Sequence, residues 1–246
     1  MTCAMDIGEQ MLVSGAEVHR VEESVSRMCR AFGAIRTEVF IITSSIVVTL
    51  YAADGNVYTQ TRRITSSSSD FERLHALNQL SRRICNEGLT EAQIRRELDR
   101  VAKCHTYPFW LECVCYAVIA AAFTIFFGGG LVEMTVSFFV GAIVRFAILF
   151  SDTILSNKIF SKFFSAATAT LFAFLALKLG FISSVDKVII GNIMSLIPGI
   201  GLTNALRDLF VGDSIAGLLR SIEALLIALA IAAGYFLVAV LGGLVS

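Results

Sequence analysis

The sequence predicts a polytopic α-helical membrane protein, a bundle of about five transmembrane helices preceded by a small α+β cytoplasmic domain. Hydrophobic residues make up 56% of its 246 residues, charged residues only 16%, and the mean hydropathy is +0.74. Soluble domains carry roughly a quarter charged residues, so this chain has more apolar surface than one soluble core absorbs. The formal net charge is zero, which argues against nucleic acid as a partner.

The charges divide the chain into two parts. Thirteen of the 20 lysines and arginines, and 13 of the 20 acidic residues, lie before Pro108, while the 138 residues after it hold seven of each sign. This division predicts a cytoplasmic α+β domain over residues 1–107 and a transmembrane helical domain over residues 108–246. Charged residues interrupt the stretch near Met1, so no signal peptide is expected and the N-terminal domain should stay in the cytoplasm.

The first domain is expected to begin with a helix over residues 5–32, where apolar side chains recur at steps of three and four residues. Ser14-Gly15-Ala16-Glu17 fits a capping box, so this helix should bend or restart there. β-branched and aromatic runs then predict three strands, and Asp54-Gly55 predicts the tight turn before the last of them. The strands are expected over residues 37–43, 46–51 and 57–63.

Two further helices should complete the first domain after a polar linker over residues 66–69. Ser69-x-x-Glu72 is expected to cap a helix that Gly88 ends, and Thr90-x-x-Gln93 to cap the next, which runs to about Lys103. No G-x-x-x-x-G-K-[ST] motif occurs, so ATP binding through a P-loop is not expected. The scattered cysteines and the three histidines are interpreted as unpaired thiols and surface side chains, and neither a metal site nor a cofactor is predicted.

Five apolar segments are long enough to cross a hydrocarbon core about 30 Å thick. Basic residues in the short flanking loops favour a cytoplasmic N-terminus and an outward C-terminus, although Lys178 and Lys187 oppose that orientation. The predicted location is the bacterial inner membrane, with lipid around the bundle. The segments are approximately Phe109–Phe127, Leu131–Phe150, Phe163–Ile182, Val188–Leu206 and Ile215–Leu241.

The fourth segment carries the strongest sign of function. Pro198 removes a backbone donor, and the nearby glycines make unwinding inexpensive, which is typical of a midplane binding site in a carrier. Arginine offers bidentate recognition of a carboxylate, and buried carboxylates could bind a substrate amine or a coupling proton. The candidate substrate-binding residues are Pro198, Gly199, Thr203, Asn204, Arg207, Asp208, Arg145 and Arg220, and the candidate coupling residues are Asp213 and Glu223.

Simpler interpretations stay open for each of these features. Pro198 could merely kink a packed helix, and Arg207 with Asp208 could be an interfacial ion pair. Arg220 and Glu223, three residues apart, could neutralise each other.

Two motifs resemble those of the threonine/serine exporter family. Gly15-Ala16-Glu17-Val18-His19-Arg20-Val21-Glu22 is similar to its G-A-E-x-x-R-V-E signature, and residues 198–208 resemble its P-G-x-x-L-T-N-A-x-R-D motif. The resemblance implies a cytoplasmic motif (Gly15, Glu17, Arg20 and Glu22) and a bundle that exports small metabolites. It is to the larger subunit of two-subunit systems, for which succinate export is described, so a small second membrane subunit or a homo-oligomer is expected.

The hypotheses are therefore a secondary exporter subunit for threonine/serine or succinate, a membrane enzyme, and a membrane-anchored sensor or scaffold whose cytoplasmic domain recruits a partner. The enzyme is disfavoured because the membrane half has no histidine, and Cys113 and Cys115 have no histidine near them in the membrane half. We expect the chain not to be an enzyme.

Overall fold

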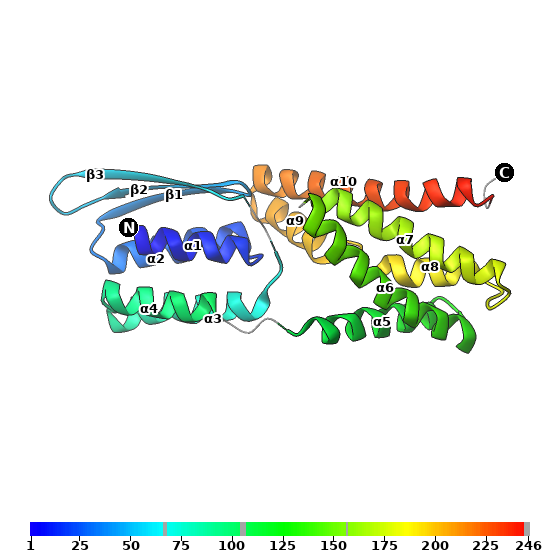
Figure 1. Cartoon of the computed structure of the whole chain (residues 1–246). Coiled ribbons are helices and arrows are strands. Elements are labelled where there is room, and N and C mark those ends of the chain that lie inside the picture. The colour runs from blue at the N-terminus through cyan, green and yellow to red at the C-terminus, as the bar shows by residue number, and fades with distance from the viewer. Residues whose placement is uncertain (66–67, 104–106, 156, 244–246) are drawn as a thin grey trace. The chain divides into compact units, whose positions relative to one another are not determined.

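The computed structural model describes residues 1–65, 68–103, 107–155 and 157–243. Contacts between residues divide the chain into two units, which are described separately (Figure 1). The first unit comprises Met1–His105 together with Leu202–Ser221. The second comprises Thr106–Gly201 and Ile222–Ser246. The first unit thus includes Leu202–Ser221, which the sequence analysis grouped with the transmembrane domain.

The N-terminal part of the first unit is a three-layered α+β fold. An antiparallel sheet of order β1-β2-β3 lies on one side of α1 and α2, and α3 and α4 lie on the other (Figure 1). The three predicted strands are confirmed, with Val47 paired with both Phe40 and Thr61. The elements are α1 (Thr2–Val13), α2 (Val18–Ala31), β1 (Arg36–Ile42), β2 (Ser45–Tyr51), β3 (Val57–Arg63), α3 (Phe71–Glu87) and α4 (Glu91–Ala102).

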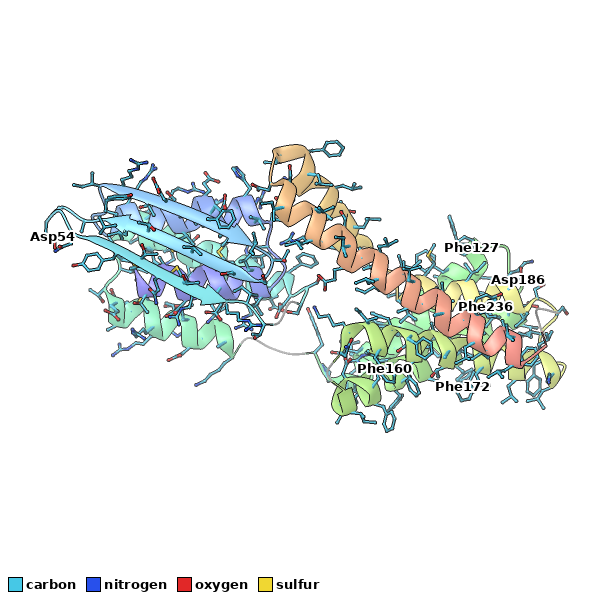
Figure 2. The ribbon with its side chains drawn as sticks, turned by 90° about the horizontal axis from the view of Figure 1, so that it is seen from above. Asp54, Phe127, Phe160, Phe172, Asp186 and Phe236 are labelled. Atoms are coloured by element: carbon cyan, nitrogen blue, oxygen red, sulfur yellow. The ribbon has the colours of Figure 1, made fainter. Side chains whose placement is uncertain are left out.

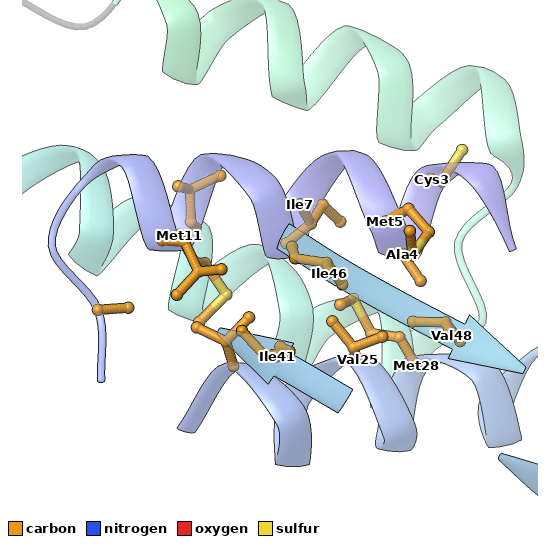
Figure 3. Close-up of a cluster of buried hydrophobic side chains, with 14 of the residues drawn as sticks. Cys3, Ala4, Met5, Ile7, Met11, Val25, Met28, Ile41, Ile46 and Val48 are labelled. Atoms are coloured by element: carbon orange, nitrogen blue, oxygen red, sulfur yellow. The ribbon is translucent and has the colours of Figure 1, made fainter. Parts of the chain in front are cut away.

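The core of this fold forms where α1 and α2 meet the sheet (Figure 3). Met5 and Ile7 of α1, Met28 of α2 and Ile46 of β2 are all fully buried. Burial of each such side chain stabilises the fold by roughly 1.5–3 kcal/mol. A Cβ on Gly8 would lie 2.6 Å from Val25, so the glycine allows α1 and α2 to approach closely. Close packing of α1 against α2 and of both helices on the sheet therefore fixes how these elements lie relative to one another.

The predicted break between the first two helices is confirmed, but the predicted capping box is wrong. Ser14 follows the last turn of α1, and Glu17 is the residue that precedes α2. Gly15 has φ +92°, and the Ala16 N–H donates to the Met11 carbonyl at 3.0 Å. This left-handed step ends α1 before Ser14 can cap a new helix. Glu17 is left at the start of α2 with its carboxylate available for other partners.

The ends of α3 and α4 follow local chemistry. The carboxylate of Asp70, rather than the hydroxyl of Ser69, caps α3 by accepting from the Arg73 N–H at 2.9 Å. Gly88, at φ 65°, ends that helix as predicted. The Thr90–Gln93 capping box of α4 is confirmed. In the predicted linker over residues 66–69, residues 66 and 67 lie outside the described part of the chain.

The remaining helices are apolar. Four of them are long and apolar enough to cross a membrane, or up to five if α8 and α9, bent by 55°, count as one span. The start of the third predicted span was wrong, because Asn157 caps α7 and brings Lys158 and Lys162 into the helix. The helices are α5 (Phe109–Phe126), α6 (Leu131–Leu155), α7 (Lys158–Lys178), α8 (Val185–Met194), α9 (Gly199–Val211) and α10 (Ser214–Leu241).

The helices of the second unit pack through small residues and direct large ones outward. A Cβ on Gly141 of α6 would lie 2.8 Å from the Tyr116 carbonyl of α5. Phe160, Phe172 and Phe236 project from the helices and are exposed (Figure 2). Close backbone approach with an apolar exterior is typical of helices that pack in lipid.

The closest approach to a backbone atom among the described residues is at Gly234 of α10, where a Cβ would lie 2.3 Å from the Phe163 carbonyl of α7. We expect Gly234→Ala to lower the free energy of unfolding by roughly 1–3 kcal/mol, because the helices must separate. Thermal unfolding of the detergent-solubilised chain measures this. Ala233→Val, at an exposed position of the same helix, is the matched control. An unchanged melting temperature for Gly234→Ala would contradict the close contact.

Candidate functional site

Two distant motifs of the sequence come together within the first unit. We call the cluster of Glu17, Arg207, Asp208 and Arg220, with the carbonyl of Ala16, the motif junction. Glu17 lies at the start of α2, Arg207 and Asp208 lie on α9, and Arg220 lies on the first turns of α10. Gly217 makes this meeting of α9 and α10 possible, because a Cβ there would lie 2.8 Å from the Leu209 backbone nitrogen.

Arg220 is the buried centre of the motif junction. Its Nη2 donates to the Ala16 carbonyl at 2.9 Å, and its Nη1 lies 3.1 Å from Asp208 Oδ2. The side chains of Arg220 and Asp208 are only 14% and 3% exposed. Removing one partner of such a buried pair leaves the other charge buried without a counterion, which typically lowers the free energy of unfolding by about 3–5 kcal/mol. The Arg220 side chain thus joins α9 and α10 to the joint between α1 and α2.

Arg207 makes the exposed contact of the junction. Its Nη1 donates to Glu17 Oε1 at 2.7 Å, across a sequence separation of 190 residues. The Arg207 side chain is 55% exposed, and Glu17 Oε2 also lies 3.8 Å from Arg20 Nε. An exposed ion pair contributes only about 0–1 kcal/mol. Arg207 can therefore exchange its carboxylate partner at little cost.

The two simple pairings that the sequence left open are both wrong. Arg207 pairs with Glu17 rather than with its neighbour Asp208, and Arg220 pairs with Asp208 rather than with Glu223. Consecutive residues on a helix point in different directions, so Arg207 and Asp208 reach different partners. Glu223 is exposed on α10 and belongs to the second unit.

A cavity of about 200 Å³ adjoins the exposed ion pair. Asn204 of α9 lines it together with Glu17 and Arg20, so an amide, a carboxylate and a guanidinium face one small space. A second cavity of about 280 Å³ shares Arg20 and Asn78 with the first and is lined also by Arg27 and Arg82. Met11, Phe71 and Leu74 also line the first cavity, so its polar groups face an apolar wall. The charged and amide groups of the two cavities suit a small molecule that carries a carboxylate.

The other candidates of the fourth segment lie at the helix break. The chain bends by 55° between α8 and α9, and Pro198 stands at that break. Gly199 is exposed at the start of α9. Thr203 is also exposed. The predicted interruption is therefore present, while Asn204, Arg207 and Asp208 are the members that join the motif junction or its cavity.

Arg145 belongs to the second unit and is engaged there. Its guanidinium donates to Glu112 and lies over the rings of Phe109 and Tyr116, at 5.2 and 5.9 Å from their centroids. Its side chain is 17% exposed. Arg145 is thus neutralised within its own helix pair, in the unit that does not contain the motif junction.

Sequence reasoning missed a buried polar cluster in the second unit. Thr124 Oγ1 donates to Ser137 Oγ at 2.7 Å, and Asn192 Nδ2 donates to the same oxygen at 2.8 Å. Asn192 is 1% exposed, and its Oδ1 has no hydrogen-bond partner among the described residues. The signal available was an asparagine beside Gly191 within an apolar segment, since intramembrane amides join helices.

Glu22 of the first motif lies near Asp213, the residue that precedes α10. Glu22 Oε1 accepts from the Ile41 N–H at 3.1 Å. Burial raises the pKa of Glu22, and the nearby negative charge of Asp213 raises this pKa further. His19 is exposed on the same face of α2, one turn before Glu22. The first motif therefore also lies close to Asp213, which follows the second motif by five residues, and the two carboxylates that meet there carry like charge.

Comparison with known proteins agrees with these motifs. Residues 2–242 match the model of the family described as "Putative threonine/serine exporter". The chain is 25% identical to a "Probable threonine/serine exporter" of Mycobacterium tuberculosis over 93% of its own length, which covers 43% of that protein. It is 26% identical to proteins named "Probable succinate transporter subunit YjjP" of Klebsiella aerogenes and Escherichia coli, over 95% of this chain and 90% and 91% of theirs. No solved structure matches the chain.

The two ion pairs of the junction should differ sharply in their contribution to stability. We expect Arg220→Met to lower the free energy of unfolding by about 3–5 kcal/mol because Asp208 is left buried and unpaired. Arg207→Met should lower it by no more than about 1 kcal/mol. Thermal or denaturant unfolding of the purified chain measures both. A double variant, Asp208→Leu with Arg220→Met, should recover much of the loss, and equal effects of the two single variants would contradict the assignment.

Proposed function

This chain belongs to the threonine/serine exporter family, and we propose that it is a subunit of a secondary exporter of small carboxylates or amino acids in the bacterial inner membrane. Family membership and the apolar helices support a multi-pass membrane protein of a transporter family. We propose that the N-terminal α+β part lies in the cytoplasm, as the basic residues that precede α5 favour. Its motif junction would then receive the substrate from the cytoplasm.

The observation that carries this proposal is the exposed contact of Arg207 with Glu17 beside the small cavity that Glu17, Arg20 and Asn204 line. We propose that a substrate carboxylate displaces Glu17 from Arg207, while Asn204 donates to the bound molecule. The guanidinium of an arginine binds a carboxylate through two parallel hydrogen bonds, and the carboxylate of a substrate can accept both of them. Because the pair is exposed, displacing Glu17 costs little, and the buried Arg220–Asp208 pair keeps the helices in place.

The relatives' names leave two substrate classes, threonine/serine and succinate. The junction offers what each requires. A zwitterion needs an acid beside the arginine, and Glu17 supplies it; a dicarboxylate needs a second cation, and Arg20 lines the same cavity. Pro198 and Gly199, at the helix break, would let α9 move relative to α8 during transport. Arg145, held by Glu112, is the weakest of the proposed substrate-binding residues.

Energy coupling and assembly complete the proposal. The sequence has no P-loop, so a proton gradient or the gradient of the substrate itself would drive export, with Asp213 and Glu223 as the candidate coupling carboxylates. The YjjP relatives are named as subunits. We propose that this chain likewise works with a small second membrane subunit or further copies of itself, which would cover part of the outward apolar surface. Transport, and not catalysis, is the activity that this arrangement serves.

Arg207 should be required for export. In vesicles that contain the chain with its partner subunit, we expect Arg207→Ala to reduce efflux of labelled threonine or succinate at least about 10-fold, as loss of a charge-assisted pair of about 1.4 kcal/mol predicts. Arg95→Ala is the matched control, since Arg95 pairs with Glu91 at 2.6 Å and is similarly exposed. Efflux unchanged by Arg207→Ala would refute the proposed site.

Glu17→Gln should identify the substrate class. For a dicarboxylate, we expect the substitution to lower KM because Glu17 no longer competes for Arg207. For threonine or serine, we expect KM to rise because the ammonium group loses its acid. Initial efflux rates over a range of internal substrate concentrations measure KM. Glu91→Gln on α4 is the control, and a KM that Glu17→Gln leaves unchanged for both substrates would show that the substrate does not reach the junction.

A further inference from the structure

Three side chains of residue types that can ligate a metal lie close together where α2 meets the turn between α9 and α10. His19, Glu22 and Asp213 each offer one ligand atom, and these atoms all lie within 4.8 Å of one another. His19 and Glu22 lie one turn apart on α2, so they share a face of that helix. Gly212, at φ +103°, turns the chain so that Asp213 can reach them. All three residues belong to the first unit.

The charges of this cluster lack a counterion in the described part of the chain. No ion pair there joins Glu22 or Asp213 to a lysine or an arginine, and the nearby Arg220 is paired with Asp208. Asp213 Oδ2 is buried and has no hydrogen-bond partner among the described residues. Glu22 uses Oε1 to accept from Ile41, which leaves Oε2 without that contact. A buried carboxylate oxygen without a hydrogen-bond partner, close to a second carboxylate, is costly unless a cation balances the charge.

We propose that His19, Glu22 and Asp213 bind a divalent transition-metal ion of the Zn²⁺ or Mn²⁺ type. One imidazole nitrogen with two carboxylate oxygens is a donor set that such ions accept, whereas Ca²⁺ and Mg²⁺ prefer oxygen alone. Bonds of about 2.1 Å require ligand atoms about 3.4 Å apart, which side-chain rotation can achieve from the present separations. Three protein ligands leave a position for water, and the exposed His19 gives the ion access from solvent. The proposal departs from the sequence prediction that no metal binds.

The metal would join the first motif to the turn between α9 and α10, which follows the second motif. Arg220 joins the α1–α2 joint to α9 and α10 through buried contacts, and the metal would join α2 to the α9–α10 turn through Asp213. The Arg207–Glu17 pair joins the same two elements, since Arg207 lies on α9 and Glu17 directly precedes α2. Occupancy of the metal site would therefore fix the spacing across which Arg207 and Glu17 meet.

Metal binding can be measured on the purified full-length chain without any transport assay. We expect equilibrium dialysis with Zn²⁺ to give one ion per chain, and Co²⁺ to give a visible absorption spectrum of a site with one nitrogen ligand. His19→Ala and Asp213→Asn should each weaken Zn²⁺ binding at least about 10-fold. His75→Ala, which removes an exposed histidine of α3, is the matched control and should leave binding unchanged.

Two results would overturn the proposal. One is no stoichiometric Zn²⁺ or Mn²⁺ binding by the wild-type chain. The other is equal binding by wild type, His19→Ala and Asp213→Asn, which would place the metal elsewhere. If Asp213→Asn fails to fold, Glu22→Gln provides the second test of the carboxylates. Dialysis measures metal binding and not transport. A negative result would therefore contradict the metal site without contradicting the proposed export function.

Discussion

A guanidinium removed from water is the constraint on which the functional part of this molecule depends. Arg220 is buried and satisfied from two directions, by the carboxylate of Asp208 and by the carbonyl of Ala16. Both partners must stay in place, because an unpaired buried charge is far more costly than a broken surface pair. The Ala16 carbonyl is fixed in turn by the left-handed step at Gly15 that ends α1. The half-buried Glu17 is then held where the exposed Arg207 can reach it.

The second unit solves a related problem with different residues. Arg145 lies beside two aromatic rings and forms an ion pair with Glu112. The Ser137 hydroxyl forms hydrogen bonds with both Thr124 and Asn192. In an apolar environment such polar groups cannot hydrogen-bond to water, so they must bond to one another. These bonds determine which faces of the helices pack together. Glycines at the contacts let backbones approach, as at Gly141 and Gly234. The polar groups specify the arrangement, and the small residues make it close.

Local chemistry in the sequence predicted most of the elements but few of the partners. The period of the apolar side chains located the helices and strands, and the Thr90–Gln93 capping box was confirmed in detail. The errors arose where one local signal competed with another, as when Gly15 ended α1 before Ser14 could cap α2, or when Asn157 started α7 early. The partners of Arg207 and Arg220 could not be predicted by spacing, because each contact depends on how distant segments pack. Adjacent residues such as Arg207 and Asp208 look like a pair in sequence, but helical geometry separates their directions.

The difference in burial between the two ion pairs explains which of them a metabolite can change. A ligand bound with a millimolar dissociation constant has only about 4 kcal/mol of binding free energy. Breaking the buried Arg220–Asp208 pair would consume about 3–5 kcal/mol, nearly all of that energy. Displacing Glu17 from the exposed Arg207 costs no more than about 1 kcal/mol, so most of the binding energy remains available. A weakly bound substrate can therefore act at Arg207 alone, and the buried pair supplies the fixed frame against which that exchange takes place.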